Sequence, residues 1–345
     1  MIVIRPIAKH DFEEYVALAL VSQMNFFTLP KDRRLLEARF EKALHSFQTN
    51  ISSPDREFYL FVAEDLDTKK MVGVAAICAT SGGNEPLYFF RKEEETIESH
   101  LADVVKKIPI LNPISYVRGP TEVASLFVLP EARGLGVGKL LSFARFLFIA
   151  RFSERFTGTV SAELRGKIEN GTSLFWDGVG RHFFNKSFKE VQDLMQYGRS
   201  FISHFVPKYP IYVDLLPKEI QELIGKVDTE TMAAFSLLSR LGFAVSDEVD
   251  ILDAGPKLKC AKENILAISK SRVVWVDKIE ETIETKAPTI ISNERLDMRA
   301  CFADLRLLNG DKVAISREVA SCLEVGVGDP VRTFDFAHHF KAVQP

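Results

Sequence analysis

The sequence has 345 residues, 46% of them hydrophobic and 26% charged, and a formal net charge of −3. A chain of this length can bury a large core, and its interspersed acidic and basic residues argue against nucleic acid as a partner. The longest apolar run, "LLSFARFLFIARF" (Leu140 to Phe152), contains an arginine and is too short to span a bilayer, so we expect no membrane partner.

The N-terminal residues and the cysteines predict the cellular setting. "MIVIRPIAKHDFEEY" contains acidic side chains and no long apolar segment, unlike a secretory signal or a transit peptide. The four cysteines lie far apart, with no Cys-x-x-Cys pair, as expected for reduced thiols rather than for a zinc site. The histidines show no metal-ligand spacing. We expect a cytoplasmic protein without a metal.

The first third of the chain alternates strand and helix patterns. "MIVIRP" predicts a short strand, and Asp11 and Glu14 stand at the Asp-x-x-Glu spacing that marks the start of a helix. Residues 26–53 are expected to be mainly helical, because their apolar residues recur at helical spacing. "REFYLFVAED" and "MVGVAAICAT", separated by "LDTKK", predict a β-hairpin.

A glycine-rich junction follows the next strand. "EVASLFVLP" predicts a strand buried on both faces, and "KLLSFARFLFIARFSERF" predicts a long helix. A dinucleotide-binding fingerprint would need glycine at position 139, which is lysine, and a Walker A loop would need glycine at position 133, which is arginine. What remains is Arg-Gly-x-Gly-x-Gly at the start of a helix, where backbone N–H groups can face an anion. A glycine-rich turn without a ligand is the alternative.

This junction resembles the pyrophosphate loop of the GNAT acyltransferase superfamily, which has the pattern Arg/Gln-x-x-Gly-x-Gly/Ala. The resemblance implies that an acyl-CoA binds here, with its pyrophosphate on the loop amides and its pantetheine arm along the preceding strand. The cofactor-binding residues expected on this basis are Leu126, Phe127, Val128, Arg133, Gly134, Gly136 and Gly138.

A second stretch, "TMAAFSLLSRLGFAVSDEVDIL", predicts a helix that ends at Gly242 and a strand that follows it. It is similar to the penultimate helix and final strands of the same superfamily. Many members carry a tyrosine there that protonates the leaving thiolate, whereas this chain has Leu238. The resemblance therefore implies that the proton must come from another group.

Over nearly its whole length the chain is similar to the arginine (and ornithine) N-succinyltransferases of bacterial arginine catabolism. The stretches that carry this resemblance include "TLP", "EPLYFFR", "AELRGKIENGTSLFWDGVGRHFF" and "HFVPKYPIYVDLLP". It implies an α/β (α+β) fold: a GNAT-type mixed central sheet flanked by helices over residues 1–255, and a small β-rich extension over 256–345. The alternating short runs and turns of the extension favour an antiparallel or barrel-like appendage, and the charged segment 278–290 reads as a linker.

The resemblance implies transfer of a succinyl group from succinyl-CoA to the α-amine of arginine. The alternatives are acetyl transfer to another amine and a non-catalytic homologue that binds an acyl-CoA or serves as one subunit of an assembly. A small-molecule amino acid is the expected partner, and a homo- or hetero-oligomer is left open.

Two carboxylates are candidate catalytic residues. The family carries a histidine, assigned as proton donor, where this chain has Asp228, and an ordinary aspartate titrates near about 3.9, far from neutrality. Asp228 could therefore have a raised pKa, pair with a cationic substrate, or have lost the role. Glu122, at the start of the strand before the glycines, could act as a base through a water, or it could be a solvated strand end.

The two substrates also call for fixed charges. A guanidinium group calls for carboxylates and a succinyl group calls for a cation. The candidate carboxylates are Glu163, Asp228, Asp250 and Asp253, and the candidate cations are Arg91, Arg165, Arg181 and Lys208. Each, taken alone, is more often a surface charge.

Overall fold

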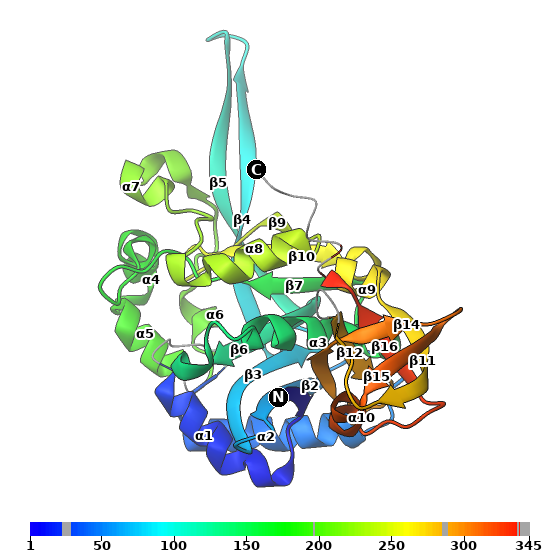
Figure 1. Cartoon of the computed structure of the whole chain (residues 1–345). Coiled ribbons are helices and arrows are strands. Elements are labelled where there is room, and N and C mark those ends of the chain that lie inside the picture. Colours follow the sequence, from blue (N-terminus) through cyan, green and yellow to red (C-terminus); the bar gives the residue numbers. More distant parts are fainter. Residues whose placement is uncertain (23–28, 196, 285–288, 337, 339–345) are drawn as a thin grey trace.

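The computed structural model describes residues 1–22, 29–195, 197–284, 289–336 and 338 (Figure 1). Its strands are β1 (Ile2–Pro6), β2 (Phe58–Asp65), β3 (Lys70–Cys78), β4 (Gly82–Ser99), β5 (Val104–Arg118), β6 (Thr121–Val128), β7 (Thr159–Glu163), β8 (Ile211–Tyr212), β9 (Ala244–Asp250), β10 (Pro256–Ala261), β11 (Arg272–Glu280), β12 (Thr289–Asn293), β13 (Ala300–Ala303), β14 (Leu305–Leu307), β15 (Lys312–Ser316) and β16 (Pro330–Phe334). Its α-helices are α1 (Phe12–Val21), α2 (Arg33–Gln48), α3 (Val137–Arg151), α4 (Arg181–Phe184), α5 (Phe188–Met195), α6 (Ile202–Phe205), α7 (Lys218–Gln221), α8 (Met232–Arg240), α9 (Leu266–Ser269) and α10 (Arg317–Leu323).

The strands form one mixed sheet in the order β14-β15-β11-β16-β12-β13-β1-β2-β3-β6-β7-β10-β9-β4-β5-β8. The pairs β6–β7 and β11–β15 are parallel and the others antiparallel. The expected mixed sheet with flanking helices and a β-rich C-terminal extension is confirmed.

Alternation along β2 explains how helices cover both faces of the sheet. Leu60 and Val62 belong to a core with α1 and α2, whereas Phe61 and Ala63 belong to a core with α3. Successive side chains of a strand point to opposite faces, so a strand between two helical layers is apolar throughout. Most residues of helix α3 are buried, and its first turn fixes where the glycine-rich loop ends.

The N-terminal helix begins where the sequence predicts, but by a different mechanism. Asp11 is the N-cap of α1, yet its side chain makes no capping hydrogen bond within that helix. Its carboxylate instead accepts both Nη atoms of Arg5, at 2.7 and 2.9 Å, and Glu14 accepts the backbone N–H of Met71. The predicted helix start is therefore confirmed, although Asp11 and Glu14 do not cap α1: Asp11 also accepts the N–H of Ala8, ahead of the helix, and Glu14 is used by the start of β3.

The predicted helix over residues 26–53 is α2, which covers 33–48; residues 26–28 lie outside the described residues. The expected hairpin is β2 and β3, and Gly242 ends α8 with a φ of 101°. In the segment expected to be a linker, residues 278–280 continue β11, and residues 285–288 are not described.

The C-terminal extension differs in detail from the sequence expectation. It contains α10, capped by the Ser316 hydroxyl, and the parallel pair of β11 and β15. Strand β10 lies between β7 and β9 in the central sheet. We therefore propose that the boundary with the extension lies near residue 270, after α9, rather than at 255.

Strands β4 and β5 form a long two-stranded arm that projects from the body (Figure 1). The arm pairs with the rest of the sheet only near its base, through β9 at residues 89–91 and through β8 at residues 110–111. No described helix is long and apolar enough to cross a membrane.

Candidate functional site

A bulge in β6 opens the sheet. The register between β3 and β6 shifts by one residue between the pairs Val74–Phe127 and Ala76–Ala124, and Ser125 takes a left-handed conformation with a φ of 53°. The parallel ladder between β6 and β7 covers only Thr121 and Glu122. The two strands therefore separate after Glu122.

The direction of the β6 peptides follows from their pairing. The N–H of Leu129, just after β6, donates to the carbonyl of Val72 in β3. Because peptide directions alternate along a strand, the N–H groups of Leu126 and Val128 point toward the opening beside β7. The Val128 carbonyl points the same way and accepts Nε of Arg133 at 3.3 Å.

A buried arginine supports the bulge. Arg145 of α3 donates to the carbonyls of Ala124 and Ala76, at 3.2 and 3.4 Å, on the two strands that the bulge distorts. Burial lowers the pKa of this guanidinium to about 9. Arg145 was not identified from the sequence, because an arginine inside an apolar helix reads as a surface residue.

The glycine-rich loop joins β6 to α3. Gly134 and Gly136 have φ values of 82° and 81°, a region that favours glycine, and Gly136 is the N-cap of α3. A Cβ on Gly138 would meet only the side chains of Val128 and Leu126, at 3.7 and 3.9 Å. The loop therefore leaves open space above the first turn of a 15-residue helix.

A cavity of about 1040 Å³ runs from this loop through the opening between β6 and β7. Leu126, Phe127, Val128, Arg133 and Gly138 of the expected cofactor residues line it, whereas Gly134 and Gly136 lie just outside its wall. Leu238 of α8 also lines it. The sequence-predicted strand, loop and helix thus converge on one cavity.

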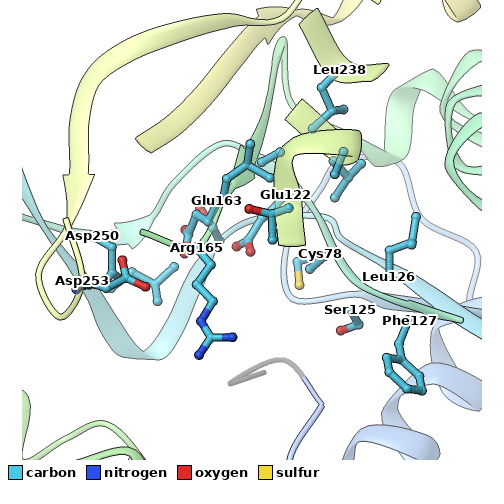
Figure 2. Close-up of a pocket in the computed structure, with 18 of the residues that line it drawn as sticks. Cys78, Glu122, Ser125, Leu126, Phe127, Glu163, Arg165, Leu238, Asp250 and Asp253 are labelled. Atoms are coloured by element: carbon cyan, nitrogen blue, oxygen red, sulfur yellow. Dashed lines mark hydrogen bonds between the residues drawn. The ribbon is translucent and has the colours of Figure 1, made fainter. Parts of the chain in front are cut away.

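Four carboxylates form an acidic part of the wall. They are Glu122 from β6, Glu163 from β7, Asp250 at the end of β9, and Asp253 from the turn that follows. Figure 2 shows Glu122 beside Glu163 and Asp250 beside Asp253, with Arg165 projecting into the cavity between these pairs and the open side.

Burial and the charges of neighbouring carboxylates raise the pKa values of Glu122, Asp250 and Asp253. Glu122 is 7% exposed, and burial, with the charge of Glu163, raises its pKa to about 7. Burial raises the pKa of Asp253 to about 6 and, with the charge of Asp253, raises that of Asp250 well above its usual value. The buried ammonium of Lys257 offsets part of this negative charge. Its Nζ lies 3.4 Å from Oε1 of Glu163 and 3.8 Å from the centre of the Phe89 ring.

Backbone N–H groups orient the two aspartates. Oδ1 of Asp250 accepts the N–H groups of Leu252 and Asp253, and Oδ1 of Asp253 accepts that of Gly255. A Cβ on Gly255 or Gly166 would overlap the facing backbone at 2.1 and 2.0 Å. This packing explains why both chain segments carry glycine beside the acids.

Asp228 lies outside the cavity wall. Its carboxylate accepts the N–H of Ile168 at 3.1 Å and that of Glu230 at 2.8 Å, and its own N–H donates to the carbonyl of Arg165 at 2.9 Å. These bonds fasten the segment that follows β7. Glu122, the other catalytic candidate, is buried at the cavity wall rather than at a solvated strand end.

Of the candidate cations predicted from the sequence, one lines the cavity and three do not. Arg165 lines the cavity, whereas Arg91 pairs with Asp247 and Glu248, Arg181 lies near Asp177, and Lys208 is exposed. His100, in the turn of the β4–β5 arm, is also remote from the cavity. Among the described residues no group of three or more histidine, cysteine, aspartate or glutamate side chains could hold a metal.

Sequence reasoning missed a basic part of the wall, formed by Arg39 and Lys42 of α2 and by Arg199. Arg39 and Lys42 stand three residues apart on a helix, so their shared face was readable from the sequence. No spacing relates them to Arg199, which the fold brings from a distant segment.

Comparison with known proteins gives a full-length match. The family described as "Arginine N-succinyltransferase beta subunit" matches residues 2–267, and its C-terminal domain matches residues 271–335. The chain is 36% identical to the arginine N-succinyltransferase subunit alpha of Pseudomonas aeruginosa over 335 residues, which cover 96% of this chain and 99% of the relative. It is 33% identical to the arginine N-succinyltransferase of an Enterobacter species, covering 96% and 97% of the two chains.

A solved structure agrees with these matches. The arginine/ornithine succinyltransferase subunit AI of Pseudomonas aeruginosa superimposes with a TM-score of 0.88 at 34% identity, covering 97% of this chain and 98% of that one.

The raised pKa of Glu122 predicts a pH-dependent stability difference. A carboxyl that titrates near 4.5 when unfolded but near about 7 when folded lowers the free energy of unfolding as pH rises between these values. Glu122→Gln removes this loss, so wild type should lose about 3 kcal/mol relative to the variant between pH 4.5 and pH 7.5. Urea unfolding of both proteins across this range measures it. Glu98→Gln, on the exposed arm, is the control; a wild-type and Glu122→Gln difference independent of pH would refute the raised pKa.

Proposed function

Because this chain belongs to the arginine N-succinyltransferase family of acyltransferases, we propose that it transfers a succinyl group from succinyl-CoA to the α-amine of arginine. The observation that carries the proposal is a single cavity that joins the glycine-rich loop to acidic and basic side chains through the opening in the sheet. These are the features that a coenzyme A thioester and a charged amino acid both require.

The donor's coenzyme A portion is assigned to the loop and strand. The backbone amides at Gly134 to Gly138, at the start of α3, would bind the pyrophosphate, because a helix N-terminus favours an anion. The pantetheine arm would lie along β6 and bond the peptide groups of Leu126 and Val128, which point into the opening. This arrangement brings the thioester toward Glu122.

Glu122 is proposed as the base. An amine attacks a thioester only as the free base, and a carboxylate with a pKa of about 7 can accept the ammonium proton near neutrality. The nitrogen then bonds to the carbonyl carbon, the oxyanion accepts a hydrogen bond from the Leu126 N–H, and the C–S bond breaks. Of the two protons that nitrogen loses, one goes to the coenzyme A thiolate and the other to solvent. Leu238 cannot supply a proton, so protonated Glu122 is the available acid.

The acidic part of the wall is proposed to bind the guanidinium group of arginine. Glu163, Asp250 and Asp253 offer carboxylate oxygens that match the planar donors of guanidinium. The cation would also favour ionisation of these crowded acids. Asp228 is proposed as a positioning residue, which holds the segment from Arg165 to Ile168 through backbone hydrogen bonds rather than exchanging a proton.

We also propose that the protein is cytoplasmic and forms a homodimer through the β4–β5 arm. The four cysteines are free thiols, as expected in a reducing compartment. A two-stranded ribbon is marginally stable alone, and one face of the arm exposes Ile97 and Val104. On that face Lys106 lies opposite Ile97 near the tip, and Glu93 and Glu95 lie nearer the base. If two arms paired antiparallel about a two-fold axis, Lys106 of each protomer would face Glu93 and Glu95 of its partner.

The transfer reaction is tested by thiol release. Wild type should release free thiol with succinyl-CoA and arginine, and Glu122→Gln should lower kcat by about 10²- to 10⁴-fold, the usual contribution of a general base. Glu98→Gln on the arm should leave kcat unchanged. Coenzyme A binding without thiol release from wild type would favour a non-catalytic homologue, and release with acetyl-CoA and another amine only would favour the acetyltransferase alternative.

The loop assignment is tested at Gly138, since its φ is ordinary and its surroundings admit a side chain. Gly138→Val should weaken coenzyme A binding by about 10- to 100-fold, because it blocks approach to the helix N-terminus. Gly158→Val is the matched control, because no atom lies within 4 Å of its Cβ position and it lies outside the cavity. Equal calorimetric affinities for wild type and a folded Gly138→Val protein would exclude the assignment.

The arm contact is tested by sedimentation velocity. Wild type should sediment as a dimer, and the double change Ile97→Lys with Val104→Lys should yield a monomer, since it places four lysines in the contact. Val105→Lys, on the opposite face of the arm, should leave the dimer intact. A wild-type monomer, or a dimer that survives the double change, contradicts this contact.

A further inference from the structure

The proposed reaction does not use the basic part of the cavity wall. Arg39 and Lys42 come from α2, which packs against β2, and Arg199 follows α5. Helix α2 covers the face of the sheet opposite α3. These cations therefore meet the opening from the other side of the sheet from the glycine-rich loop.

The position of these cations along β6 follows from strand geometry. Cys78 of β3 pairs with Glu122, and the charges of Arg39 and Arg199 act on both side chains. Val128, beside the glycine-rich loop, lies six residues further along β6. Six residues of strand span roughly 20 Å, so the basic group lies at the end of β6 away from the loop.

The cations have little negative charge around them. Within the described part of the chain the side chains of Arg199 and Lys42 make no hydrogen bond or ion pair, and Arg39 has a buried Nη1. The facing acids are Glu122, which burial keeps partly protonated near neutrality, Glu57, which accepts the backbone N–H of Asp55, and Glu85, which accepts the backbone N–H of Arg199 at 2.7 Å. Burial also raises the pKa of the Cys78 thiol to about 12, so it stays neutral.

Three neighbouring cations at a cavity wall repel one another, and the partial burial of Arg39 and Arg199 is costly without an anion. A carboxylate entering the cavity would supply that charge and accept charge-assisted hydrogen bonds from both guanidinium groups. The ammonium of Lys42 adds a third donor. The chemistry of this group therefore suits a bound carboxylate.

We propose that Arg39, Lys42 and Arg199 form a subsite that binds the free carboxylate of a substrate. This inference rests on the proposed function, whose two substrates each carry one such group: the terminal carboxylate of the succinyl chain and the α-carboxylate of arginine. The location beyond Glu122, in line with a pantetheine arm that runs along β6 from the loop, fits the succinyl chain, which extends past the thioester. The subsite would then select a dicarboxylic acyl donor over acetyl-CoA.

The experiment uses Arg199→Gln, because this side chain has no partner among the described residues whose loss would unfold the protein. If the succinyl carboxylate binds here, kcat/KM for succinyl-CoA should fall about 10- to 100-fold, while that for acetyl-CoA changes far less. If the α-carboxylate of arginine binds here, the loss should appear with arginine and be absent with agmatine, which lacks that carboxylate. Either selective loss supports the subsite and identifies which of the two substrate carboxylates binds there.

Controls separate this inference from the proposed function. Arg34→Gln, on the exposed face of α2, should change none of these values. Calorimetric affinities of wild type and Arg199→Gln for succinyl-CoA, acetyl-CoA, arginine and agmatine need no turnover, so they test the subsite even if wild type releases no thiol. Unchanged affinities, or equal losses for both members of each pair, would overturn the subsite.

Discussion

The bulge at Ser125 is the constraint on which the rest of the site depends. A regular β6 would continue its ladder with β7 and close the sheet, leaving the glycine-rich loop without a passage to the acids on the other side. The left-handed Ser125 costs backbone strain, and the distorted ladder leaves carbonyls that need donors. Arg145 supplies donors to two of them from α3, so one buried cation stabilises the distortion and ties it to the helix that carries the loop.

The same opening explains why so many charged side chains are tolerated inside the sheet. Glu122 and Glu163 stand on adjacent strands, and burial, with the charge of Glu163, raises the pKa of Glu122. Lys257 compensates part of the charge from within, and arginine would compensate more when bound. A site of this kind is poised for a cation on the acidic side and for an anion beside Arg199. On the proposed function, its charges would discriminate among substrates before any chemistry occurs.

Much of this arrangement could be predicted from the sequence, because strong local signals mark it. The apolar run before Arg133, the spacing of Gly136 and Gly138 and the helix after them fix the strand, loop and helix. Local signals could not reveal the bulge, since Ser125 is an ordinary strand residue, nor the use of Asp11 by Arg5 in place of a helix cap. The basic group was also out of reach, because long-range packing alone brings Arg199 to α2.

Asp228 holds a position to which the sequence resemblance attaches a histidine and a proton-donor role. Both of its carboxylate oxygens accept backbone N–H groups, from Ile168 and Glu230, which suits this side chain to hold a loop. Leu238 lies on the cavity wall and Asp228 outside it, so neither position to which the resemblance attaches a proton-transfer role places an acid at the cavity. Proton transfer would then fall on a carboxyl whose pKa is set by burial on the sheet itself. Glu122 meets that condition, because it is the least exposed acid of the cavity and stands at the last ladder position before the strands separate, where the proposed course of the donor along β6 would bring the thioester.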